Sequence, residues 1–198
     1  MAAYRPDASV EVARAWERAF FDPRLPATRR VALRMAIVLG DGSALTPLVN
    51  LARVGLGGSH LDGPWPGSRD KRDAGAHHVW RHTHGHQRFS WVHLDDVVRA
   101  VSFIAASDLE GVVTIAAPGT TDDASLMRAL RRILGVPVGL PLPRPLLELG
   151  SVALRTEVEL LLKSRWVVPE RLEAAGFRFA FPEIEGALRD LLSRPPGR

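Results

Sequence analysis

Residues 87–93 bring together side chains that suit ligand binding. Arg88 carries a planar guanidinium that can form paired hydrogen bonds with a phosphate or a carboxylate, and Trp91 offers a face on which a ring can stack. Ser90 and His93 add a hydroxyl and an imidazole to the same stretch. A structural interpretation stays open beside this one, in which Trp91 is core, His93 caps or packs, and Arg88 is solvated.

A further arginine, Arg34, lies inside an otherwise apolar stretch, residues 31–40. A charged side chain in such a run is rare without a partner. Arg34 is therefore a candidate for binding an anionic substrate, and the alternative is an ion pair that holds the fold.

Five histidines form the one cluster whose spacing suits a metal ion: His77, His78, His82, His84 and His86. The order His-x-His-x-His puts imidazoles on one face of an extended chain, which could chelate Zn²⁺ or Ni²⁺. Structural metal sites need rigid, supported ligands, whereas glycine, proline and charged residues surround this cluster. We therefore predict a solvated loop and no metal site.

The composition is that of an ordinary globular protein, with 198 residues, 46% hydrophobic and 24% charged. The absence of cysteine excludes disulfides, thiolate metal sites and cysteine nucleophiles, and is compatible with a cytoplasmic location. The net charge of +4 comes from dispersed arginines, so we expect no nucleic-acid partner. No apolar run reaches the roughly 18–20 residues of a membrane span, and the first residues show no signal peptide.

Amphipathic helices alternate with apolar strands, which predicts the α/β class. Helices are expected over residues 8–21, 44–54, 94–107, 122–134, 146–164, 169–175 and 183–192, and strands over 30–40, from 88, over 111–118 and over 177–181. Residues 35–39 are apolar on both faces, as in the centre of a parallel sheet. A central strand needs neighbours on both edges, and the chain offers few strands, so the sheet looks like part of a larger one.

Residues 89–96, with the sequence Phe-Ser-Trp-Val-His-Leu-Asp-Asp, resemble a strand–helix junction of the extended short-chain dehydrogenases/reductases, the NAD(P)-dependent epimerase/dehydratase superfamily. The chain is most similar to the atypical epimerase family proteins, whose C-terminal portion is a domain of unknown function. Four ordered segments carry the resemblance: 15–17 with 31–40; 55–58; 89–96; and 168–172 with 175–179, 182–183 and 187–188.

Two features of that family are missing from the sequence. No Gly-x-Gly-x-x-Gly or Gly-x-x-Gly-x-x-Gly follows a strand and opens a helix, so nothing cradles a diphosphate. The family's tyrosine general acid/base has a lysine four residues on, whereas the single tyrosine, Tyr4, is followed at that spacing by Ala8. The two lysines, Lys71 and Lys163, lie far away in the sequence. We therefore assign no catalytic residue.

The resemblance implies four regions in this chain. Residues 1–58 would supply a helix and strand of a Rossmann-like sheet, 59–87 a disordered His-rich insert, 88–135 the remaining Rossmann-like strands and helices, and 136–198 a mainly helical, substrate-side subdomain. The fold expected is thus a partial Rossmann-like parallel sheet plus that C-terminal subdomain.

The function implied is that of the C-terminal, substrate-side part of a nucleotide-sugar epimerase-like protein, inactive alone. NAD or NADP is the implied cofactor, although we do not expect this chain alone to bind it. The substrate would meet Arg34, Arg88, Ser90, Trp91 and His93, which the resemblance places at a substrate-facing strand end. Two alternatives stay open: a non-catalytic binding or interaction module, and an enzyme reconstituted with a separate N-terminal half. The partner would be that half, or a second copy bound through the exposed sheet edge.

Overall fold

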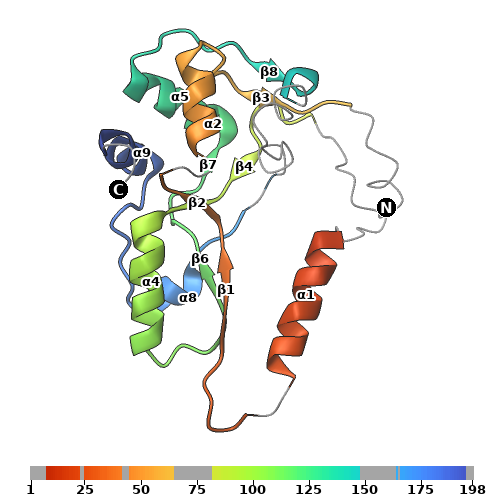
Figure 1. Ribbon diagram of the computed structural model, residues 1–198, viewed down its shortest axis with the longest axis vertical. Coiled ribbons are helices and arrows are strands. Elements are labelled where there is room, and N and C mark those ends of the chain that lie inside the picture. The colour runs from red at the N-terminus through yellow and green to blue at the C-terminus, as the bar shows by residue number, and fades with distance from the viewer. Residues whose placement is uncertain are drawn as a thin grey trace.

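The computed structural model describes residues 8–22, 25–41, 45–64, 82–147, 164 and 166–194. Within these ranges the chain is a mixed α/β structure with parallel strands, so the predicted class is confirmed (Figure 1). None of the described helices combines the length and the apolar character that crossing a bilayer requires.

The centre of the fold is a pair of parallel strands, β1 (Val31–Met35) and β6 (Gly111–Ile115). After β1 the chain continues into β2 (Ile37–Leu39), which pairs in parallel with β5 (Trp91–His93). The predicted strand over 30–40 is therefore two strands with a break at Ala36.

The break at Ala36 marks the point where the two central chains separate. The Ala36 N–H donates to the Ile115 carbonyl at 3.0 Å, whereas the next N–H, of Ile37, donates to the Ser90 carbonyl at 3.2 Å. On the other side the Trp91 carbonyl accepts the Ala117 N–H at 2.7 Å. Strand β5 thus lies between β2 and the residues that follow β6, at the carboxyl end of the central pair.

Two helices begin where the sequence predicts. Helix α4 (Leu94–Ala106) is capped by the His93 side chain, which accepts the Asp95 N–H. Helix α5 (Asp123–Leu134) is capped by Asp122 and ends at Gly135, whose left-handed conformation suits glycine. Helices α1 (Ala8–Phe21), α2 (Leu45–Arg53), α8 (Glu170–Ala174) and α9 (Ile184–Ser193) also match the predicted ranges to within a residue or two.

The buried apolar residues form two main clusters. The larger one joins α2, α5 and α9 around Trp91 and Leu39, and the second joins β6, α4 and α8 around Ile115 and Leu172. Helix α1 contributes to neither cluster, and Figure 1 shows it standing apart from the body of the molecule.

Two pairs of two-residue strands complete the upper part of Figure 1. Strand β3 (His60–Leu61) pairs in parallel with β8 (Leu142–Pro143), and β4 (Arg88–Phe89) pairs antiparallel with β7 (Thr121–Asp122). Of the insert expected over 59–87, residues 59–64 and 82–87 are therefore part of the ordered fold. Residues 65–81, and most of the helix predicted over 146–164, lie outside the described residues.

The strand predicted over 177–181 is wrong, because these residues form no ladder. The last two of these residues bond instead to one buried carboxylate: Asp96 accepts the N–H groups of Ala180 and Phe181, each at 2.9 Å, together with the Arg99 guanidinium. The alternation of Phe177 and Phe179 reflects packing against the second core cluster.

Replacing this carboxylate by an amide should destabilise the protein strongly. In Asp96→Asn the amide nitrogen would face a backbone N–H, which leaves donors unpaired in a fully buried place. We expect the free energy of unfolding to fall by about 2–4 kcal/mol, measured by urea denaturation. The matched control is Asp108→Asn, at an exposed position, which should change stability by less than about 0.5 kcal/mol. Equal effects of the two variants would contradict the role given to Asp96.

Candidate functional site

Four of the five residues predicted to bind substrate, Arg88, Ser90, Trp91 and His93, lie on β4, β5 or between them, whereas Arg34 lies on β1. Arg88 is exposed, and its guanidinium carbon lies 4.2 Å from the centre of the Trp166 ring. Its backbone N–H donates to the Ser164 hydroxyl at 3.0 Å, which ties residue 164 to strand β4. Trp166 itself is 51% exposed, so a charged fork and an aromatic face are presented together to solvent. The sequence analysis did not identify Trp166, because no motif in the sequence connects it with Arg88.

Ser90 and Trp91 are buried, in contrast to Arg88. The Ser90 hydroxyl accepts the Val167 N–H at 3.0 Å, and the Trp91 indole N–H donates to the Gly119 carbonyl at 2.9 Å. Both side chains therefore fix neighbouring segments around β5. Ser90 bonds to the residue that follows Trp166, whereas the Trp91 side chain packs in the larger core cluster.

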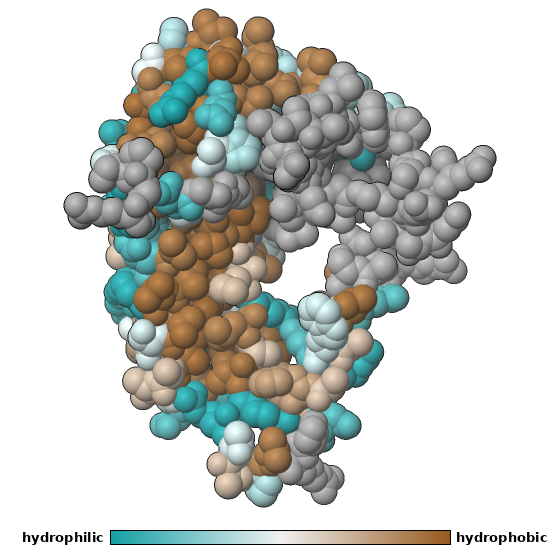
Figure 2. Space-filling view, viewed as in Figure 1, coloured by the Kyte–Doolittle hydropathy of each residue, from teal (hydrophilic) through white to brown (hydrophobic). Residues whose placement is uncertain are grey.

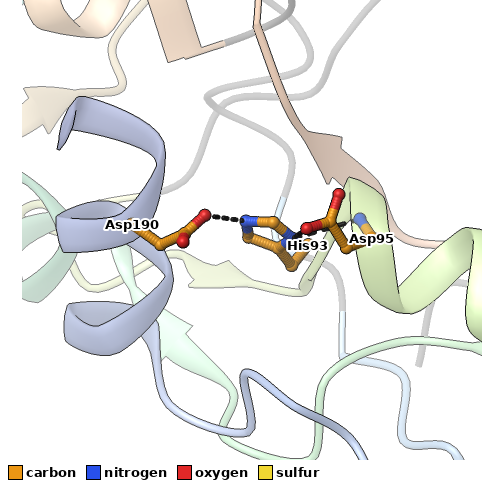
Figure 3. Close-up of side chains that lie close together, drawn as sticks. All are labelled: His93, Asp95 and Asp190. Carbon is orange, nitrogen blue, oxygen red and sulfur yellow. Dashed lines mark hydrogen bonds and ion pairs between the residues drawn. The ribbon is translucent and has the colours of Figure 1, made fainter. Parts of the chain in front are cut away.

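His93 is fully buried and its two ring nitrogens are both engaged (Figure 3). Nδ1 accepts the Asp95 N–H at 3.1 Å, so in the neutral ring the proton resides on Nε2, which donates to the Asp190 carboxylate at 3.2 Å. The ring also stacks on Phe181, with centroids 3.9 Å apart. His93 thereby joins the end of β5 to helix α9.

His93, Asp95 and Asp190 are also the one group among the described residues whose ligand atoms come close enough to hold a metal ion. The Arg194 guanidinium bonds to both carboxylates, at 2.7 Å from Asp190, and so supplies the positive charge that an ion would bring. With both His93 nitrogens and both carboxylates already bonded, the cluster is a closed hydrogen-bond network.

Arg34 pairs with helix α1. Its guanidinium donates two hydrogen bonds to the Glu17 carboxylate, at 2.6 and 2.5 Å. This pair lowers the pKa of Glu17 below its ordinary value, chiefly through the hydrogen bond. The ion-pair interpretation of Arg34 therefore has a named partner, while a role in substrate binding remains a prediction.

The predicted histidine cluster is only partly described, because His77 and His78 lie outside the described residues. The rings of His82 and His84 stack with centroids 5.9 Å apart, and His86 Nδ1 lies 2.9 Å from the Asp122 carboxylate. In the described part of the cluster, two histidine rings stack on each other, and His86 bonds to Asp122, the residue that caps helix α5.

The sequence analysis overlooked a buried pair at His60 and Asp123. His60 Nδ1 lies 2.7 Å from one Asp123 carboxylate oxygen, and the His60 N–H donates to the other at 2.7 Å. Gln87 joins the pair by donating to the His60 carbonyl at 3.0 Å. The three residues hold β3 against the start of α5, and their distance apart in the sequence left no signal.

The N-termini of α4 and α5 do not fit the diphosphate of a dinucleotide. Such a group binds where a glycine-rich turn opens a helix and bare N–H groups face it. Two of the helices that follow strands begin with carboxylates, Asp95 and Asp96 in α4 and Asp122 and Asp123 at α5, whereas α2, which follows β2, has no acidic residue in its first turn. These carboxylates already occupy the helix N-termini and would repel a second anion.

The comparisons with known proteins agree with the resemblance. The family described as "Domain of unknown function (DUF1731)" matches residues 142–191. The epimerase family protein SDR39U1 of Bos taurus is 33% identical over 183 residues, which cover 90% of this chain and 53% of that protein. The chain thus spans about half the length of the curated relatives it matches.

Two solved structures are similar over nearly the whole chain. The crystal structure of human epimerase family protein SDR39U1 (isoform 2) with NADPH has a TM-score of 0.69 and 26% identity, covering 96% of this chain and 62% of that one. A nucleoside-diphosphate sugar epimerase from Corynebacterium glutamicum has a TM-score of 0.61 and 21% identity, covering 96% and 32%, and shows a shared fold. The resemblance to the NAD(P)-dependent epimerase/dehydratase superfamily, and the Rossmann-like character of the fold, are confirmed.

The network around His93 should be sensitive to acid. The hydrogen bond from Arg194 lowers the pKa of Asp95 below its ordinary value. Because the folded-state pKa is the lower one, the pair stabilises the fold above the ordinary carboxyl pKa, and this contribution is lost as the pH falls through the folded-state value. Arg194→Gln should raise the Asp95 pKa toward the ordinary value in an NMR titration. Arg189→Gln, which removes only an exposed partner of Glu185, should leave it unchanged. An Asp95 pKa that is the same in wild type and Arg194→Gln would refute this cause.

Proposed function

We propose that this chain forms the substrate-side part of an NAD(P)-dependent, nucleotide-sugar epimerase-like enzyme, and that it is catalytically inactive alone. One contrast supports the proposal most directly. The chain is similar over 96% of its length to a protein whose crystal structure contains NADPH, yet the N-termini of its helices α4 and α5 carry carboxylates that disfavour a diphosphate. Cofactor binding is therefore assigned to residues outside the described part or to another polypeptide.

We also assign the groups that transfer protons to residues outside the described part of the chain. An epimerase-like reaction needs a group that takes a proton from a substrate hydroxyl while hydride passes to the nicotinamide. The tyrosine and both lysines of this chain, the residue types that the family uses, lie outside the described residues.

The substrate is proposed to meet the chain at Arg88 and Trp166. The guanidinium provides paired donors for a phosphate, and the half-exposed indole provides a surface for a base or a sugar. Ser90 supports this position by holding Val167, the neighbour of Trp166. In this proposal His93 and Trp91 position the strand, and Arg34 orients helix α1.

The cofactor part of the proposal is tested by titration of NADPH into the purified chain. We expect no saturable change in nicotinamide fluorescence up to about 1 mM, the upper end of common enzyme affinities. Saturable binding in the micromolar range would overturn the proposal that this chain lacks a cofactor site.

The substrate part is tested with UDP-glucose as the probe. We expect saturable binding by calorimetry, with a shift of the Trp166 indole NMR signal, and a loss of affinity of about ten- to a hundredfold in Arg88→Gln. The matched control is Arg132→Gln, an exposed arginine paired with Glu185, which should bind as the wild type does. Equal affinities in the two variants would assign the nucleotide sugar to another place, and the absence of binding to wild type would favour a non-catalytic interaction module.

A further inference from the structure

A buried imidazole–carboxylate pair is hydrogen-bonded to the residue that precedes Arg88. His60 lies in β3, Asp123 is the first residue of α5, and both side chains are buried. One oxygen of the Asp123 carboxylate lies 2.7 Å from His60 Nδ1, and the other accepts the His60 backbone N–H at 2.7 Å. Both oxygens of the carboxylate are therefore bonded to the same residue.

The carboxylate determines which ring nitrogen of His60 carries the proton. An ionised carboxylate can only accept hydrogen bonds, so Nδ1, the nitrogen that faces it, has to donate. In the neutral ring the lone pair is then on Nε2. This atom is buried and has no hydrogen-bond partner in the part of the chain that the structure describes, so a proton on Nε2 would be a buried donor without an acceptor. The geometry selects the neutral ring with its proton on Nδ1.

Both members of the pair bond to Gln87. The Gln87 side-chain amide donates to the His60 carbonyl at 3.0 Å, and its side-chain oxygen accepts the Thr83 hydroxyl at 2.8 Å. The Gln87 backbone carbonyl accepts the Asp123 N–H at 3.1 Å. Gln87 is thus held at its side chain by His60 and at its backbone by Asp123.

Arg88 follows Gln87 and begins strand β4. In the pairing of β4 with β7, Arg88 lies opposite Asp122, the neighbour of Asp123. The side chain of Gln87 is buried and that of Arg88 is exposed, as expected for successive residues of an extended chain. A shift of the Gln87 backbone would therefore move the Arg88 guanidinium relative to the Trp166 ring, whose centre lies 4.2 Å from the guanidinium carbon.

We propose that His60 and Asp123 are positioning residues for Arg88, and that they act through the neutral His60 ring with its proton on Nδ1. This inference rests on the proposed function, in which Arg88 meets the phosphate of the substrate. A binding group keeps its geometry only when buried hydrogen bonds behind it hold its backbone in one place. The pair supplies such bonds through Gln87, and it leaves the Arg88 side chain exposed to a ligand.

The variant Asp123→Asn tests the role of the pair with little change of shape. If the amide oxygen keeps the bond to the His60 backbone N–H, the amide nitrogen faces Nδ1 and can only donate to it. Nitrogen NMR should then find the ring proton on Nδ1 in the wild type and on Nε2 in the variant. We expect the Arg88 amide and Trp166 indole signals of the ligand-free variant to shift, and its affinity for UDP-glucose to fall about tenfold.

Two further comparisons separate positioning from a loss of stability. Ile104→Ala removes a buried side chain of the second core cluster, so it should lower the melting temperature while leaving the Arg88 and Trp166 signals and the affinity unchanged. His60→Asn keeps a side-chain N–H that can donate to Asp123, whereas His60→Leu removes it. We therefore expect the wild-type Trp166 signal and affinity in His60→Asn, and a loss of both in His60→Leu.

Three results would overturn the inference. They are a ring proton on Nε2 in the wild type, Arg88 and Trp166 signals that stay in place in Asp123→Asn or move equally in Ile104→Ala, and equal Trp166 signals in His60→Asn and His60→Leu. The last comparison decides the matter if Asp123→Asn does not fold. All three readouts use the ligand-free chain, whereas a wild-type chain that binds no UDP-glucose would count against the proposed function.

Discussion

A buried carboxylate, that of Asp96, joins helix α4 to the segment before helix α9. Asp96 lies in the first turn of α4, and it accepts two backbone N–H groups from a segment more than eighty residues later. Charged acceptors form stronger hydrogen bonds than neutral ones, and a buried charge must be satisfied on all sides. His93, three residues earlier, adds a second connection through Asp190 in α9. The C-terminal part is therefore fixed against the end of β5 by polar contacts as well as by the apolar core.

These connections explain why the residues of the predicted site divide into two groups. Trp91, His93 and Ser90 point into the protein and hold segments in place, so that the exposed pair of Arg88 and Trp166 has a defined position. Carboxylates at the start of α4 and α5 serve the same structural purpose as helix caps. The same charges make these helix N-termini unsuitable for a diphosphate, so structural support and cofactor binding exclude each other there.

The open side of the molecule has a different character. Along β1 the side chains of Leu33 and Met35 are exposed, and Figure 2 shows a gap between α1 and the body of the molecule. Helix α1 is joined to the strand by the pair of Arg34 and Glu17 and by hydrogen bonds from Arg30 to the carbonyls of Phe20 and Phe21.

The sequence by itself determined the α/β class and most helix bounds, because local periodicity, caps such as Asp122 and the glycine at 135 act over a few residues. Only the tertiary structure decided which polar residues meet. The break at Ala36, the partner of Arg34, the stacking of Arg88 on Trp166 and the joining of residues 180 and 181 to Asp96 all depend on contacts between distant segments. The alternation of apolar residues over 177–181 led to the wrong prediction of a strand. Apolar spacing indicates which side chains are buried, but it does not indicate where the backbone groups form hydrogen bonds.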